Sequence, residues 1–299
     1  MNMRLGCNPL CWMNTDFPQM EGQVPVDQCL SEIATIGYEG VEMEDPFLKV
    51  LDKLPGWLKA RGLECIGKWH STNLLESTLD EELERLDRHC DMLEKLGAKV
   101  VNLAECTGCV HQDHGMSLSR RPVIGSDDQW ERLCDGLEVL ARHIKNRGMV
   151  SAYHHHMGTV VQSAEDIDRL MAGTQTLGLL YDTGHLLFAK ADPIAVLKAH
   201  ASRISHVHCK SVRPSVLEEK LKVDSAFFSS VLDGVFTVPG ERDDIVDYDR
   251  IIETLKSAGY CGWLVVEAEQ DPSKADPFTY AQLGYETLHS ILNTTLTFS

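Results

Sequence analysis

The stretch Gly148-Met149-Val150-Ser151-Ala152-Tyr153-His154-His155-His156 shows the unit from which the chain is built. Gly148 follows an amphipathic stretch with helical spacing, and glycine is the residue that most often ends an α-helix. The mostly apolar residues 149–154 predict a buried β-strand, and three histidines stand where that strand ends. The segment therefore predicts a helix end, a buried strand and a polar group at the carboxyl end of the strand.

The same order of strand and helix recurs along the whole chain. The predicted strands are 4–8, 40–44, 63–68, 99–103, 149–154, 177–182, 204–208 and 263–267. The predicted helices are 26–36, 47–61, 79–96, 127–147, 164–171, 193–200, 247–257 and 277–292. Glycine also ends several of the other helices, namely at Gly37, Gly62, Gly97 and Gly259. Apolar strands alternating with helices indicate a parallel sheet covered by helices, and eight such units predict a closed barrel.

We therefore predict an α/β fold, a (βα)8 TIM barrel, as a single domain over residues 1–299. The alternative is an open, doubly wound sheet, but no G-x-G-x-x-G motif follows the first predicted strand. One connection, residues 213–247, is much longer than the others and predicts a short helix over 215–221. Because long connections of this kind usually cover the active face of a barrel, we expect a lid there.

Composition narrows the class of protein. The 28 basic and 45 acidic residues give a formal net charge of −17, which repels nucleic acid and anionic membrane surfaces. No apolar run approaches the length of a membrane span and no signal sequence is evident, so we expect a cytoplasmic protein. The ten cysteines are scattered through predicted strands and helices, which predicts free thiols.

Imidazoles and carboxylates stand at the ends of the last four predicted strands. Such groups are costly to bury alone, and the carboxyl ends of barrel strands meet at one rim. A single histidine there is more often a hydrogen-bonded core residue, but four sets at the same strand ends favour a shared cation. The predicted ligands are His154, Asp182, His208 and Glu267. This set contains no thiolate and suits Mn²⁺, Co²⁺, Fe²⁺ or Zn²⁺.

Other polar residues lie near the same predicted rim. They are Asn8, Glu42, Glu44, Lys68, His70, Asn102 and Glu105. Each is explained equally well as a substrate contact or as a polar group satisfied by a neighbour. Lys68 and His70 rank above the others, because a cation inside a barrel rim needs an anionic or metal-bound partner.

Cys106-Thr107-Gly108-Cys109, followed by His111 and His114, resembles a zinc or dithiol motif. No second C-x-x-C accompanies it, and its position after the fourth strand lacks a thioredoxin-like context. We interpret the stretch as part of a rim loop, in which Arg120 and Arg121 are available to an oxygen-rich ligand.

With these features in place, the chain resembles the xylose-isomerase-like barrel superfamily of sugar isomerases, epimerases and dehydratases. The segments that carry the resemblance are Gly6-Cys7-Asn8-Pro9-Leu10-Cys11-Trp12, Tyr153 to Thr159, Asp182-Thr183-Gly184-His185, His206-Val207-His208-Cys209-Lys210-Ser211-Val212-Arg213, Asp233 to Gly240 and Gly259 to Pro272. The match is best with the dehydratase branch. It implies a small-molecule cyclic polyol ketone as substrate, Mn²⁺ or Co²⁺ as the metal and glutathione as a further cofactor. A homo-oligomer is a further candidate assembly.

One departure bears on the reaction. In the isomerase and epimerase relatives the ligand on the fifth strand is a glutamate, whereas the matching position here is His154. Epimerases of this type use two carboxylates as opposed proton-transfer groups, so the change favours elimination of water over epimerisation. A sugar or cyclitol isomerase or epimerase remains the nearest alternative. A sugar-binding barrel without turnover is the alternative from another class, and the charge disfavours a phosphodiesterase acting on DNA.

The remaining residues then receive roles. Elimination from a ketone needs a base for the α-proton and an acid for the β-hydroxyl, and we assign these two roles to His156 and His185. Lys68 belongs to the catalytic set as a residue that orients hydroxyls. The expected substrate-binding residues are Asn8, His70, Arg213 and Glu269.

Overall fold

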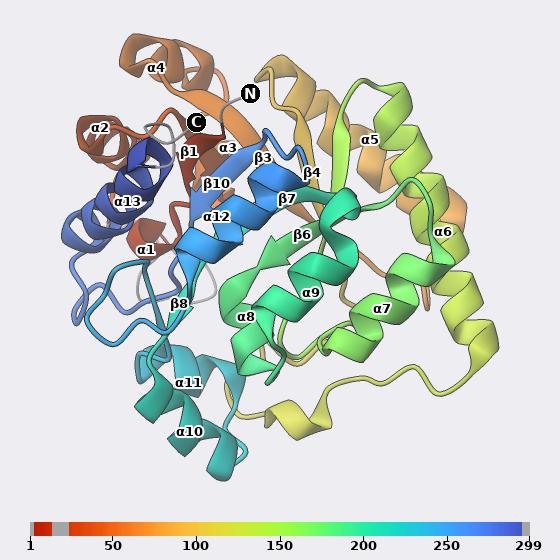
Figure 1. Ribbon diagram of the computed structural model, residues 1–299. Helices are drawn as coiled ribbons and strands as arrows, with labels where there is room; N and C mark the ends of the chain where they lie inside the picture. Colours follow the sequence, from red (N-terminus) through yellow and green to blue (C-terminus); the bar gives the residue numbers. More distant parts are fainter. Residues whose placement is uncertain (1–2, 14–23, 295–299) are drawn as a thin grey trace.

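The computed structural model describes residues 3–13 and 24–294 of the chain, and its centre is a closed barrel of eight parallel strands (Figure 1). The strands follow one another around the barrel in the order β1-β2-β3-β4-β5-β6-β7-β10 and back to β1. Their bounds are β1 Arg4–Cys7, β2 Gly40–Met43, β3 Glu64–Thr72, β4 Val100–Glu105, β5 Val150–His154, β6 Gly178–Asp182, β7 Ile204–Cys209 and β10 Trp263–Val266. All eight predicted strands are confirmed, and β3 continues to Thr72 because its last residues pair with β4.

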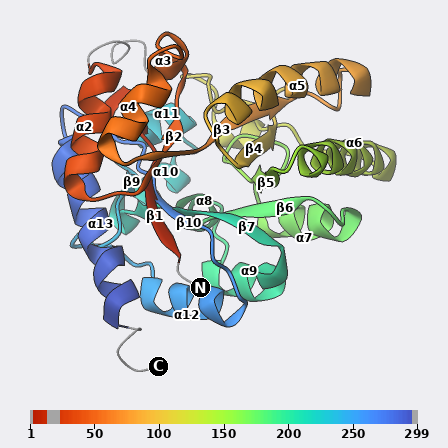
Figure 2. The same cartoon turned by 90° about the horizontal axis from the view of Figure 1, so that it is seen from above.

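Helices connect the strands and surround the barrel, as the two cartoon views show (Figures 1 and 2). The main ones are α2 Val26–Ile36, α4 Leu54–Arg61, α5 Leu79–Lys95, α6 Asp127–Asn146, α7 Ala164–Gly173, α9 Pro193–His200, α12 Tyr248–Ser257 and α13 Pro277–Thr294. Capping boxes at Thr78 and Ser163 begin α5 and α7, so the backbone N–H groups of their first turns are satisfied locally. The glycine after α2, Gly37, has a φ of 115°, a value that a side chain would make unfavourable.

Two short elements differ from the prediction. The prediction of one helix over 47–61 is wrong. The chain instead forms α3 (Asp45–Leu48) and then α4, which begins just before Pro55. Proline has no N–H to donate and clashes with the preceding turn, so it belongs at the start of a helix rather than in its middle. The second element, α8 (Thr183–Phe188), was not expected and begins directly from β6. Asp182 caps it by accepting a hydrogen bond from the N–H of His185 at 2.8 Å.

Strand alternation sets the candidate ligands above an apolar layer. Ile66, Val100, Ala152, Leu180 and Val265 form one buried cluster, with one residue from each of five strands. Side chains two apart on a strand face the same way, so His154 shares the face of Ala152, Asp182 that of Leu180 and Glu267 that of Val265. Among these five strands the interior is therefore apolar at this level, whereas His206 of β7, level with Leu180, is buried and hydrogen-bonded to Glu42. One step nearer the carboxyl ends the interior is polar.

The long connection after β7 forms a compact addition. It contains α10 (Pro214–Lys222) and α11 (Phe227–Leu232), which lie together outside the ring of barrel helices (Figure 1). A two-stranded antiparallel sheet, β8 (Ser211–Val212) with β9 (Phe236–Thr237), connects this addition to the barrel. Its apolar side chains form their own cluster with residues that follow β5 and β6. The cluster comprises Met157, Phe188, Val212, Leu217, Phe227, Phe228, Val231, Val235 and Phe236.

The remaining short helix at this end of the barrel is α1 (Leu10–Met13), directly after β1. Within residues 3–13 and 24–294, no helix combines the length and the apolar character needed to cross a bilayer.

Candidate active site

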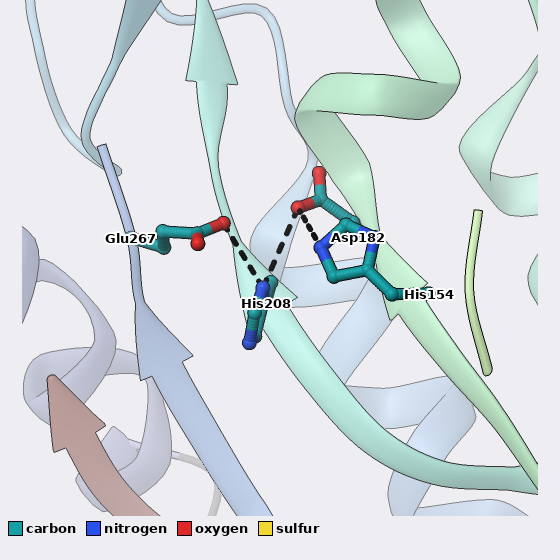
Figure 3. Close-up of side chains that lie close together, drawn as sticks. All are labelled: His154, Asp182, His208 and Glu267. Carbon is teal, nitrogen blue, oxygen red and sulfur yellow. Dashed lines mark ion pairs between the residues drawn. The ribbon is translucent and has the colours of Figure 1, made fainter. Parts of the chain in front are cut away.

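The four predicted metal ligands converge at the carboxyl end of the barrel (Figure 3). One nitrogen or oxygen from each of His154, Asp182, His208 and Glu267 lies within 4.8 Å of the others. His208 Nδ1 is 3.0 Å from Glu267 Oε2 and 3.6 Å from Asp182 Oδ2. His154 Nε2 is 3.7 Å from the same Asp182 oxygen. Strands β5, β6, β7 and β10 thus bring two imidazoles and two carboxylates to one point.

Hydrogen bonds orient both imidazoles for this arrangement. His154 Nδ1 lies 2.8 Å from the carbonyl oxygen of His155, which only accepts, so Nδ1 carries the proton and Nε2 presents a lone pair toward Asp182. His208 Nε2 lies 3.1 Å from Glu42 Oε2 and donates to that carboxylate, which turns Nδ1 toward Asp182 and Glu267. Each histidine therefore aims its other nitrogen at the shared point.

The same atoms are buried, and their neighbours are charged groups of the site itself. His208 Nδ1 and Lys210 Nζ lie 3.0 and 2.8 Å from Glu267 Oε2, but Asp182 Oδ2, His208 Nδ1 and Glu267 Oε2 make no well-directed hydrogen bond. Burial lowers the pKa of the His208 imidazole, but Glu267 and Glu42 together hold that pKa well above its ordinary value. The point between these atoms thus has a negative potential that favours a cation. Two nitrogens, two carboxylates and unsatisfied buried atoms fit a divalent metal ion.

Glu42 at the end of β2 forms a second layer behind His208. It accepts hydrogen bonds from Asn8 Nδ2 at 2.8 Å, Asn102 Nδ2 at 2.7 Å and His206 Nε2 at 2.8 Å, in addition to His208. Burial raises the pKa of this carboxyl, yet His208 and His206 hold it well below its ordinary value. From the sequence, Glu42 is expected at the rim as either a substrate contact or a polar group satisfied by a neighbour. Its position opposite His206 and His208 depends on closure of the barrel, which no local pattern reveals.

Lys210 is a further residue of the candidate site that was not predicted from the sequence. Its side chain is 1% exposed, and its Nζ lies 2.8 Å from both Glu267 Oε2 and Glu269 Oε2 and 3.6 Å from Asp182 Oδ2. The negative charge of these carboxylates outweighs burial and raises the pKa of the ammonium further. The sequence feature that could have indicated this role is the position of Lys210, two residues after His208 in a segment that carries the family resemblance.

A polar cavity of about 330 Å³ opens beside the four ligands. Its volume falls at the small end of the range for ligand pockets. The predicted site residues that line it are Asn8, Lys68, His70, His154, His156, His208, Glu267 and Glu269. Asn102, predicted to lie at the rim, also lines it, as do Trp69, His111 and Gln112, for which no site role was predicted. Asp182 is fully buried behind this lining.

Lys68 and His70 stand together on β3 at one wall of the cavity. Lys68 Nζ is held at 2.7 Å from Oδ1 of Asp45, the first residue of α3, which lines the same cavity. The ring of His70 packs against His89 with a centroid distance of 4.7 Å. Burial, with a smaller contribution from Arg85, lowers the pKa of His70 to about 4, so this imidazole is neutral at physiological pH.

His156 faces the cavity with a defined tautomer. Its Nδ1 donates to the carbonyl oxygen of Met157 at 2.8 Å, which leaves the lone pair on Nε2. Aromatic rings surround it: Trp69 at 5.5 Å, His111 at 4.8 Å and Phe227 of α11 at 5.0 Å between centroids. These contacts and the hydrogen bond of Nδ1 hold the imidazole in place.

Two predicted site residues lie behind the cavity lining. His185 is fully buried, with its ring centroid 4.0 Å from that of His156, and its Nε2 accepts a hydrogen bond from Lys210 Nζ at 3.1 Å. Arg213 donates to the carbonyl oxygens of Gly234 at 2.7 Å and Phe236 at 2.9 Å. It holds the β8–β9 sheet in place and lines a separate hollow with Tyr280. Arg213 thus lines this hollow and not the cavity beside the four ligands.

Comparison with known proteins agrees with this architecture. Residues 30–289 match the model of the xylose isomerase-like TIM barrel family. The rhizopine catabolism protein MocC of Rhizobium meliloti is 42% identical over 96% of this chain and 88% of that protein. The inosose dehydratase of Geobacillus thermodenitrificans is 40% identical over 93% of this chain and 94% of that protein.

Among solved structures, the IolI protein with a bound zinc atom superposes with a TM-score of 0.69 at 16% identity. The superposition covers 98% of this chain and 99% of that one, and at this identity it supports the fold. The matched family model and the relatives above 30% identity agree with the barrel described here. The chain belongs to the xylose isomerase-like TIM barrel family.

Proposed function

We propose that the protein is an inosose dehydratase, a metal-dependent lyase that removes water from 2-keto-myo-inositol (scyllo-inosose) to give a trihydroxycyclohexane dione. The observation that carries this proposal is the convergence of His154, Asp182, His208 and Glu267 beside a polar cavity of small-molecule size. We infer the substrate from the relatives, because a protein that is 40% identical to this chain over nearly its whole length is an inosose dehydratase. The reaction belongs to myo-inositol catabolism.

The four convergent residues would hold the metal, for which Mn²⁺ and Co²⁺ are the candidates. When bound, such an ion acts as a Lewis acid toward the substrate carbonyl and makes the neighbouring C–H bond more acidic. Glu42 supports the site by fixing the orientation of His208. Lys210 neutralises part of the charge of the surrounding carboxylates, which would otherwise repel one another.

Loss of water also requires movement of a proton from the α-carbon and delivery of a proton to the β-hydroxyl. His156 is the proposed proton acceptor, because its Nε2 lone pair is available and its ring lines the cavity. Glu269 lines the same cavity, and one of its oxygens lies within 4.8 Å of a ring nitrogen of His156. We therefore assign the second proton transfer to Glu269 in place of His185.

His185 then acts as a positioning residue. It contacts the ring of His156 on one side, and its Nε2 is 3.8 Å from Glu269 Oε2 on the other. Because it is enclosed, it reaches the reacting atoms only through these two neighbours. Its burial stabilises one arrangement of the proposed base and acid.

The opposite wall would bind the ring hydroxyls of the substrate. Lys68 and His70 supply a donor and a neutral imidazole there, and Asn8 has one amide hydrogen beyond the one it donates to Glu42. Residues 213–247 are proposed to act as a lid. Phe227 and Phe236 of that segment pack against His156 and His185 with centroid distances of 5.0 and 5.3 Å and would exclude water from the reaction.

Elimination is favoured over epimerisation by the residue at the end of β5. Epimerisation uses two opposed carboxylates, and a histidine at this position removes one of them. We also propose a cytoplasmic location, assembly into a homo-oligomer and a glutathione requirement. The family resemblance and the composition support these three proposals.

The test combines elemental analysis with one assay. Purified protein reconstituted with Mn²⁺ or Co²⁺, with and without glutathione, is incubated with 2-keto-myo-inositol while diketone absorbance and product mass are followed. We expect a product lighter than the substrate by one water. A product of unchanged mass would indicate an isomerase or epimerase instead. Calorimetric binding without any product would indicate a sugar-binding barrel.

A further inference from the structure

The turn after β4 holds two cysteines that the proposed dehydration does not use. In this turn the N–H of Cys109 donates to the carbonyl oxygen of Cys106 at 3.0 Å, and Gly108 supplies the positive φ of 62°. A hydrogen bond of this kind places the first and last Cα atoms within about 7 Å. Disulfides need a Cα separation of about 4.4–6.8 Å. The two thiols also interact closely enough to shift each other's pKa in opposite directions, so little movement separates them from a disulfide.

The chemical state of Cys109 differs from that of the other cysteines. All ten cysteines are unpaired, and burial raises the pKa of thiols such as Cys7, Cys29 and Cys209. The hydrogen bond from Cys106, helped by His111 and opposed by burial, lowers the pKa of Cys109 to about 5. This shift favours the thiolate, which is the nucleophilic form of cysteine. Cys109 is also partly exposed to solvent.

The turn is joined to the wall of the cavity. Two residues after Cys109, the buried ring of His111 lines the cavity and packs 4.8 Å from the ring of His156. The N–H of Val110 donates to the carbonyl oxygen of Gly158 at 2.9 Å, so the backbone between the thiolate and His111 is attached to the loop that follows His156. A change in the turn is transmitted directly to this wall.

We propose that Cys106 and Cys109 form a redox-active dithiol at the edge of the cavity, which a hydroperoxide oxidises reversibly to a disulfide. The Cys109 thiolate attacks a peroxide oxygen, the O–O bond breaks, and with one proton a first water leaves and Cys109 becomes a sulfenic acid. The Cys106 thiol then attacks that sulfur; the S–S bond forms, the S–O bond breaks and a second water leaves. Two thiols and one hydrogen peroxide thus give one disulfide and two waters.

The expected consequence is a lower rate in the oxidised protein. A disulfide constrains the turn and moves His111 relative to His156, and a displacement of about 1 Å at a catalytic group is enough to lower a rate by about 100-fold. The thiol chemistry goes beyond the proposed function and does not depend on it, because the oxidation is read from mass without any substrate.

The experiment uses the full chain, reduced and then treated with a small excess of hydrogen peroxide. Remaining thiols are alkylated, and the digested protein is analysed by mass spectrometry. We expect a peptide in which Cys106 and Cys109 are linked, with the loss of two hydrogen atoms, and its return to two alkylated cysteines after dithiothreitol. The variant Cys106→Ser should instead accumulate a sulfenic acid at Cys109 that dimedone labels. Cys261→Ser, a change at an exposed cysteine away from the turn, should react like the parent.

The outcomes separate clearly. If Cys106 and Cys109 stay alkylatable while other cysteines oxidise, or if Cys261→Ser abolishes the reaction, the dithiol proposal is wrong. If the disulfide forms but turnover of 2-keto-myo-inositol stays unchanged, the link to the cavity wall is wrong. A parallel loss and recovery of turnover with the disulfide supports both parts. If no dehydration occurs in either redox state, the proposed function fails while the mass result still decides the thiol chemistry.

Discussion

Gly184 lies directly against the side chain of Lys210. A Cβ atom at position 184 would be 2.5 Å from Cγ and 2.7 Å from Cδ of Lys210, distances that non-bonded carbon atoms do not tolerate. The glycine in the sequence Asp182-Thr183-Gly184-His185 therefore leaves room for the buried stem of the lysine that binds Glu267 and Glu269. The segment 182–185 and Lys210, which are far apart in the sequence, therefore pack against each other.

This contact predicts the effect of Gly184→Ala. The added methyl group should displace Lys210, loosen Glu269 and lower kcat by about 10-fold or more, because small displacements at a reacting centre are costly. The matched control is Gly56→Ala on α4, where a Cβ meets nothing within 4 Å and alanine should raise stability by about 0.5–1 kcal/mol. Steady-state kinetics and urea unfolding of both variants check this. Equal kcat in Gly184→Ala and the parent would contradict the role given to Lys210.

Glu42 should set the affinity for metal without touching the metal. The change Glu42→Gln removes the charge that orients His208, and loss of such a partner typically weakens metal binding about 10- to 100-fold. Glu131→Gln, a change at an exposed carboxylate on α6, serves as the control. Competition with a chelator measures both. Unaltered affinity in Glu42→Gln would show that His208 needs no support from that side.

Substitution of a metal ligand and substitution of the proposed base should have different effects on metal content and turnover. Glu267→Gln should lose bound metal and turnover together, because it removes one of the two carboxylates of the centre. His156→Gln should retain the metal and lose about 10²- to 10⁴-fold in kcat, the usual contribution of a proton-transfer group. Elemental analysis beside a turnover assay distinguishes the two variants. Metal loss in His156→Gln would move that residue from the proton chemistry to the metal centre.

The pair His70 and His89 should make stability depend on pH in the metal-free protein. Burial lowers the pKa of His70 to about 4 and that of His89 to about 3. Below pH 6.5 the unfolded chain binds protons at these histidines and the folded chain does not, so stability should fall as pH decreases from 6.5 toward 4. For His70 the loss over this range is about 3 kcal/mol, since one pKa unit corresponds to about 1.4 kcal/mol.

Urea unfolding at pH 7, 6 and 5 checks this dependence. Since His89→Gln removes one titrating group, its stability should decline less steeply between pH 6.5 and 5 than that of the parent. The exposed His289 provides the matched control, because His289→Gln should keep the parental slope. A slope that does not change in His89→Gln would place the acid sensitivity elsewhere.

The sequence by itself determined the barrel and the convergence of the four candidate ligands. Apolar strands and amphipathic helices are local patterns, and parallel strands that close a barrel must bring their carboxyl ends to one rim. His154, Asp182, His208 and Glu267 therefore had to approach one another wherever their loops ran. The break of the expected helix at 47–61 was also visible locally, since Pro55 marks the start of α4.

Only the tertiary structure decided which neighbours those ligands have. Glu42 reaches His206 and His208 across the closed barrel, and Lys210, directly after β7, packs against Gly184, so neither role follows from sequence spacing. His156 faces the cavity and His185 lies behind it, although both follow a strand end in a similar pattern. The physical reason is that side chains alternate in direction only within a strand, so this regularity ends at its last residue. Beyond that point the direction of a side chain depends on helix caps, turns and packing between segments far apart in the chain.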